Sequence, residues 1–106
     1  MSYAAFAAMH EAERLARAGH LDPALLIEVG RDNGVVTAQM AAFMSNRAHL
    51  AATGPHALQR AFAPFAALAQ KDLAAALQSA RELEVTLPAT ERVAEIISNV
   101  FLNQDN

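Results

Sequence analysis

Four histidines invite a metal-site hypothesis, in which histidine and carboxylate side chains would be the ligands because the sequence contains no cysteine. His10 and Glu13 are three residues apart, a spacing that places both side chains on one face of a helix. The carboxylate-bridged metal sites of helical bundles need several carboxylates and a Glu-x-x-His pair from each of two helices. This sequence has one such pair, in reversed order, so we expect no metal site and expect His10 and Glu13 to be exposed polar residues. The remaining histidines define no local site; they are His20, His49 and His56.

A nucleophile with an activating base is equally poorly supported. The serines lie in no elbow motif, and three of the four fall in predicted helices rather than at strained turns; they are Ser2, Ser45, Ser79 and Ser98. We therefore expect no catalytic residue in this chain.

An apolar set at helical spacing contains Met40, Phe43 and Met44, together with Met9 from an earlier helix. Methionine in such a pattern usually fills a core, because its thioether adapts to irregular gaps. The alternative is a small-ligand carrier with a cleft lined by Met40, Phe43 and Met44.

Lys71 and Asp72 remain as candidate site residues, at one end of the most regular helical pattern in the chain. Adjacent residues on a helix point about 100° apart, so the two side chains do not simply pair with each other. One of them can lie toward a packed face while the other reaches into a cleft. The simpler alternative is a solvated polar face.

The composition favours one all-α domain. The chain has 106 residues, 54% of them hydrophobic, with many alanines and no tryptophan. Its net charge of −3 comes from interspersed acidic and basic residues, which argues against a nucleic-acid partner. The first 18 residues include acidic and basic side chains, so they form neither a secretory signal nor a membrane span. With no cysteine, these features fit a cytoplasmic protein.

The elements that must position Lys71 and Asp72 follow from periodicity and breakers. Helices are expected over about 3–18, 23–29, 35–52, 65–84 and 88–101, with a short helical segment over 56–62 that breaks near Pro64. Asp22 is the expected N-cap of the second helix, with Pro23 at its first position. Residues 30–34 read as a turn and 102–106 as a frayed tail. The predicted fold is a single compact bundle of about five to six helices spanning residues 1–106.

Two stretches of the sequence resemble one enzyme family. Residues 71–83, KDLAAALQSAREL, are followed by Val85, Leu87, Pro88 and Thr90. They are similar to the KDL-x-x-A-x-x-x-A-x-E-x-x-V-x-L-P segment of the β-hydroxyacid dehydrogenases, the relatives of 3-hydroxyisobutyrate dehydrogenase and 6-phosphogluconate dehydrogenase. Residues 11–26, EAERLARAGHLDPALL, resemble the AEAL-x-LA-x-x-x-GLDP-x-LL segment of the same family. The resemblance covers nearly the whole chain, in the expected order.

The resemblance implies the fold of the C-terminal helical domain of that family, which covers the active-site cleft and supports dimer or tetramer contacts. It implies that Lys71 lies near the nicotinamide end of the cofactor and that Asp72 helps to hold this region in place. A preceding Rossmann domain binds NAD(P) in the family, and this chain contains no G-x-G-x-x-G. The family's catalytic lysine would fall before Met1, so no residue here inherits its role.

We therefore expect a detached C-terminal domain of an NAD(P)-dependent oxidoreductase that is not catalytically competent alone. The isolated chain is expected to bind no cofactor, and Lys71 and Asp72 to meet NAD(P) only when a Rossmann-domain protein is its partner. The alternative is a standalone helical module for dimerisation or protein interaction that keeps the fold without enzyme activity. In that case the expected partner is a second copy of the chain.

Overall fold

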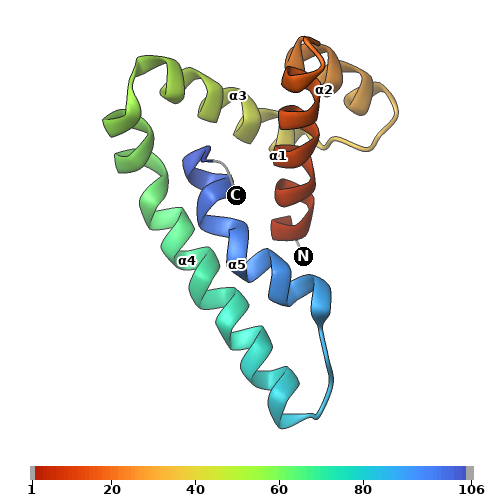
Figure 1. The fold of residues 1–106 in the computed structure, drawn as a ribbon, viewed down its shortest axis with the longest axis vertical. Helices are drawn as coiled ribbons and strands as arrows, with labels where there is room; N and C mark the ends of the chain where they lie inside the picture. The colour runs from red at the N-terminus through yellow and green to blue at the C-terminus, as the bar shows by residue number, and fades with distance from the viewer. Residues whose placement is uncertain (1, 105–106) are drawn as a thin grey trace.

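The computed structural model describes residues 2–104, and in this part of the chain it contains five helices and no β-strand (Figure 1). The prediction of an all-α fold is therefore confirmed at this level. The helices are α1 Ser2–Ala18, α2 Pro23–Asp32, α3 Ala38–Thr53, α4 Pro55–Glu82 and α5 Pro88–Leu102.

The centre of the fold is α5, which α4 and α1 cover from two sides. The longest helix, α4, runs along the long axis of the molecule, and α5 returns antiparallel beside it (Figure 1). These two helices share the most extensive packing in the fold, followed by α1 with α5. On its inner face α5 buries five apolar side chains; they are Val93, Ile96, Ile97, Val100 and Phe101.

Polar contacts add to the packing between α4 and α5. The Gln70 side-chain amide of α4 donates to the Ala94 carbonyl at 3.2 Å and to the Ser98 hydroxyl at 3.0 Å. Each bond of this kind contributes about 1 kcal/mol net. Ser98 thus accepts a hydrogen bond that fixes the helix pair.

The prediction that helical structure breaks near Pro64 is wrong, because α4 continues through this residue as one 28-residue helix. Pro64 lies on the exposed side, where the missing N–H deprives only the Arg60 carbonyl of its helical donor. A buried apolar stripe crosses the proline without losing its spacing; its members include Leu58, Phe62, Ala66, Ala69 and Leu73. Packing along this stripe outweighs the local cost of about 3 kcal/mol.

Side-chain caps account for two of the helix starts. Asp22 caps α2 as predicted, since its carboxylate accepts from the Ala24 amide at 3.0 Å and Pro23 occupies the first turn. α2 then continues to Asp32, three residues beyond the predicted end. The third helix begins at Ala38 and not at Val35, because the Thr37 hydroxyl accepts from the Met40 amide at 3.1 Å.

The end of α5 is more ordered than the predicted frayed tail. Leu102 belongs to the helix and is half-buried, while Asn103 adopts the left-handed conformation that closes many helices. The Gln104 amide donates to the Asn99 carbonyl at 2.9 Å. Residues 105–106 of the predicted tail lie outside the described part of the chain.

Candidate functional site

A buried polar cluster joins α1, α3 and the end of α5. The relative exposure is 1% for His10, 5% for Glu13 and 1% for Arg47. The expectation that His10 and Glu13 are exposed is therefore wrong. Arg47 is the reason: it comes from another helix and supplies the charge and hydrogen bonds that two buried polar side chains on α1 need.

The Arg47 guanidinium donates to three acceptors. One nitrogen, Nη1, lies 2.6 Å from the Val100 carbonyl and 2.9 Å from His10 Nδ1. The other, Nη2, lies 3.3 Å from Glu13 Oε2, while Glu13 Oε1 pairs with Arg17 Nη2 at 2.6 Å. Val100 is in the last turn of α5, where carbonyls lack intrahelical donors, so Arg47 supplies the missing donor.

The contacts of His10 assign its protonation state. Because a guanidinium only donates, His10 Nδ1 must accept, and the proton of the neutral ring is on Nε2. Nε2 lies 3.2 Å from the Gln104 carbonyl, to which it donates. Burial and the neighbouring Arg47 lower the pKa of His10, and the bond to Gln104 partly opposes them. Burial likewise lowers the pKa of Arg47, against the favourable effect of Glu13.

This cluster has the chemistry of a structural tie. Its members satisfy one another, and within residues 2–104 no buried side-chain nitrogen or oxygen lacks a partner. No group of three or more His, Asp or Glu residues in this range is arranged to hold a metal ion. The cluster thus connects three helices through polar contacts.

Lys71 and Asp72 both lie on the exposed side of α4, and their side chains have different surroundings. The Tyr3 hydroxyl donates to Asp72 Oδ2 at 2.8 Å, which links α1 to α4 across 69 residues. This hydrogen bond raises the pKa of Tyr3, with smaller effects from burial and the Asp72 charge. No salt bridge among the described residues involves Lys71.

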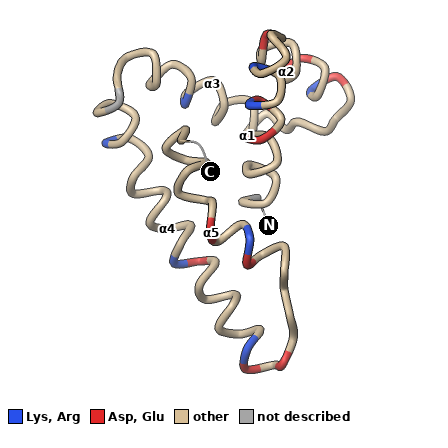
Figure 2. Tube along the Cα trace, in the orientation of Figure 1, with Lys and Arg blue, Asp and Glu red and all other residues tan. Residues whose placement is uncertain are grey.

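The surface of α4 next to Asp72 is apolar. Phe65 and Leu68 precede Asp72 at helical spacing, and their exposed fractions are 55% and 51%. They border a shallow cavity of about 240 Å³, whose other walls include Tyr3 and Phe62. We call Phe65, Leu68, Lys71 and Asp72 the α4 face. Figure 2 shows adjoining blue and red segments partway along α4, with other charged segments scattered along the chain.

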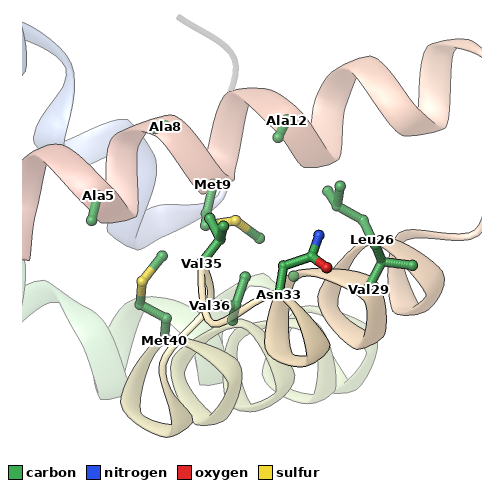
Figure 3. Close-up of a pocket in the computed structure, with 11 residues that line it drawn as sticks. Ala5, Ala8, Met9, Ala12, Leu26, Val29, Asn33, Val35, Val36 and Met40 are labelled. Carbon is green, nitrogen blue, oxygen red and sulfur yellow. The ribbon is translucent and has the colours of Figure 1, made fainter.

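A larger cavity of about 450 Å³ lies between α1, α2 and the connection to α3 (Figure 3). It differs from the cleft considered for Met40, Phe43 and Met44. Met40 borders this cavity, but Met44 is in the core and Phe43 stacks on Phe6 with ring centroids 4.7 Å apart. The three residues therefore do not share one cleft.

Comparisons with known proteins returned no matching family model, curated protein or solved structure. Among the helices of residues 2–104, none has the length and apolar character needed to cross a membrane. The candidate site consequently rests on the contacts described above.

Proposed function

We propose that this chain is a helical domain of the β-hydroxyacid dehydrogenase type, which covers the cleft of a separate NAD(P)-binding polypeptide and is not catalytic alone. The observation that carries this proposal is the division of roles between two adjacent residues. Asp72 accepts a hydrogen bond from Tyr3 and links α4 to α1, whereas Lys71 extends into solvent from the same turn. The resemblance implies that Asp72 holds this region in place and that Lys71 faces the cofactor, and the contact of Asp72 and the exposure of Lys71 are compatible with those roles.

The packing of α4 supports the same proposal. Within the stretch that resembles the family, Leu73 and Ala80 are buried, while Lys71, Asp72 and Arg81 are exposed. The apolar positions of the stretch thus form the contact with α5, and its polar start remains available to a partner. An all-α arrangement with a long α4 beside α5 is compatible with the C-terminal domain fold of that family.

In the proposed complex, the partner supplies the Rossmann domain and the proton-transferring lysine, and NAD(P) supplies the hydride chemistry. Lys71 adds a positive charge at the covered cleft, where removal from water strengthens its attraction to an anionic group. The Tyr3–Asp72 hydrogen bond holds the first turn of the motif against α1, which fixes the position from which Lys71 extends.

A cofactor-binding experiment tests this proposal. The chain is titrated with NADPH alone and again with the isolated Rossmann portion of a β-hydroxyacid dehydrogenase, and nucleotide fluorescence is measured. We expect no binding by the chain alone and tighter binding by the mixture than by the Rossmann portion. Lys71→Ala should weaken the mixture's binding about tenfold, consistent with one charged hydrogen bond. Arg81→Ala, also an exposed cation of α4, should have little effect.

Tight NADPH binding by the chain alone would contradict the proposal. So would an unchanged affinity in the mixture, or equal losses from Lys71→Ala and Arg81→Ala. A pull-down of the Rossmann portion by the tagged chain separates the possible failures, because it reports assembly without cofactor.

A second candidate is a self-associating module, and the exposure of Phe65 and Leu68 favours it specifically. Two copies that meet through the α4 face would remove both side chains from water. Sedimentation at roughly 10–200 µM, which covers dissociation constants equivalent to about 5–7 kcal/mol of association free energy, should then show a concentration-dependent dimer. Phe65→Gln should dissociate it, whereas Leu83→Gln, at an exposed leucine beyond the end of α4, should not. A strict monomer across this range would exclude the module.

A further inference from the structure

We propose that the cavity between α1, α2 and residues 33–37 is a binding site for a small, uncharged, largely apolar molecule with one hydrogen-bonding group. This inference is independent of the proposed dehydrogenase-type role, since the cavity lies away from the α4 face. The cavity volume of about 450 Å³ falls within the roughly 300–1,000 Å³ range of small-molecule sites.

The cavity is a groove with a packed floor and a side open to solvent, where Val29 and Val35 are 56% and 69% exposed. Met9, Val36 and Met40 are buried side chains that border its inner end. Figure 3 shows α1 on one side of the space, Leu26 and Val29 of α2 on the other, and Val35 of the connection beside Met9. Two methionines at the floor can adjust their side chains to an irregular ligand.

Small side chains on α1 keep this space open. Ala5, Ala8 and Ala12 follow one another at helical spacing and line the wall that faces α2. Larger side chains at these positions would project into the cavity. The three alanines along one wall therefore leave room for the apolar part of a ligand.

One wall of the cavity is held in place by a close approach between α2 and the connection. A Cβ atom placed on Gly30 would lie 2.4 Å from Val36 Cγ2, so only glycine permits α2 to sit directly against Val36. The backbone of the connection also folds back, with the Val35 and Val36 amides both donating to the Gly30 carbonyl at 2.9 Å. This wall is therefore formed before a ligand enters, which reduces the cost of binding.

The chemistry of the lining defines the ligand class. Asn33 is the one polar side chain among the described residues that line the cavity, and Figure 3 shows it extending from the end of α2 toward α1. Its amide can donate and accept a hydrogen bond, which suits a hydroxyl, carbonyl or amide on the ligand. Among the described residues, no charged side chain lines the cavity, so a charged group buried in it would lose its hydration without gaining a partner.

The extent of the lining favours a small molecule over a protein chain. Eleven residues border the cavity, whereas a stable protein interface uses about 20–30 residues on each side. Binding of a second copy at this place is accordingly treated below as an outcome that overturns the proposal.

The probe for the experiment is N-phenyl-1-naphthylamine, an uncharged aromatic amine that fluoresces when it leaves water. We expect saturable binding to the wild-type chain with one site. Ala8→Phe should weaken binding at least tenfold by filling the cavity, and Ala12→Met, tested independently, should weaken it as well. Ala74→Phe, which adds the same bulk on the exposed side of α4, should leave it unchanged. The anionic probe 1-anilinonaphthalene-8-sulfonate should bind at least tenfold more weakly than the neutral one.

Circular dichroism on each variant establishes that it is folded, and sedimentation of the same samples reports oligomeric state. The proposal is overturned if the wild-type chain shows no saturable binding, or if both filled variants bind the neutral probe as it does. Stronger binding of the anionic probe would refute the uncharged ligand class. A wild-type dimer that Ala8→Phe dissociates would show that a second copy occupies the cavity instead.

Discussion

Replacing Arg47 by methionine should destabilise the fold more than any other single change of a charged residue described above. Methionine retains apolar length but supplies no donor, so three acceptors lose their partner at once. These are the Val100 carbonyl, His10 Nδ1 and Glu13 Oε2, at 2.6, 2.9 and 3.3 Å from the guanidinium nitrogens.

The expected loss in free energy of unfolding depends on whether each of the three acceptors keeps another partner. A buried acceptor without a donor costs about 1–3 kcal/mol, and both Val100 and His10 fall in this class. Glu13 loses Arg47 but keeps its ion pair with Arg17, whose Nη2 lies 2.6 Å from Glu13 Oε1, so the carboxylate still has a cationic partner. The sum agrees with the roughly 3–5 kcal/mol for breaking a buried ion pair. This loss is a large part of the approximately 5–15 kcal/mol free energy of unfolding that is typical of a native domain.

Urea unfolding at pH 7, followed by circular dichroism at 222 nm, measures the change in the free energy of unfolding. Arg17→Met is the matched control, because it removes the other partner of Glu13 from a half-exposed position and should cost about 1 kcal/mol or less. Arg47→Lys should lie between the two, since an ammonium keeps the charge but lacks the planar fork. The reasoning is refuted if Arg47→Met costs no more than Arg17→Met.

Three further predictions use other single positions. Stability should be constant between about pH 7.5 and 9 and fall as pH drops below about 6.5, by up to 1.4 kcal/mol per pH unit. The unfolded chain then binds a proton at His10, whereas burial lowers the folded-state pKa of this histidine and keeps it neutral. A His10→Gln variant with an equally steep urea-stability profile between about pH 7.5 and 5.5 would contradict this. The lone tyrosine, Tyr3, should ionise above its ordinary pKa of 10 in an absorbance titration at alkaline pH, and Asp72→Asn should move the midpoint back toward 10, so equal midpoints would argue against the hydrogen bond. Gly30→Ala should not stabilise the helix by the usual amount of about 1 kcal/mol and should instead cost up to about 2 kcal/mol in urea unfolding. In a Val36→Ala background the cost should be smaller, because the Cγ2 contact at 2.4 Å is removed while the Cβ contact at 3.2 Å remains. The same effect in both backgrounds would exclude the steric explanation.

Local signals in the sequence predicted most of the helices. Asp22 with Pro23, and Pro88 before a strongly periodic segment, mark helix starts that depend on neighbouring residues alone. The predicted helix break at Pro64 is wrong because the local preference of proline against helix is outweighed by packing between residues far apart in the sequence. The apolar spacing from Leu58 to Leu73 continues through the proline, and that pattern was the available evidence for one long helix.

The buried cluster lay beyond sequence reasoning for a different reason. His10 and Glu13 at a three-residue spacing look alike whether they face water or a buried cation, and the deciding residue, Arg47, is 37 positions from His10. Nothing in the pattern around Arg47 distinguishes it from an exposed arginine. One usable signal was present: His10 directly follows Met9 and lies one turn after the apolar positions Phe6 and Ala7, which places it beside the buried stripe of α1.

Alanine has opposite effects in two helices: it permits tight packing of α4 and leaves an open cavity beside α1. In α4, Ala66, Ala69 and Ala80 are buried, and they let a long helix approach its neighbours closely. In α1, Ala8 and its neighbours at helical spacing face α2 across the cavity, which is left open by the side chains that the structure describes. What differs is the surface opposite: α5 presents large branched side chains to α4, whereas α2 has no buried residue of its own. A stretch rich in alanine therefore predicts either tight packing or an open site, and the partner helix determines which one forms.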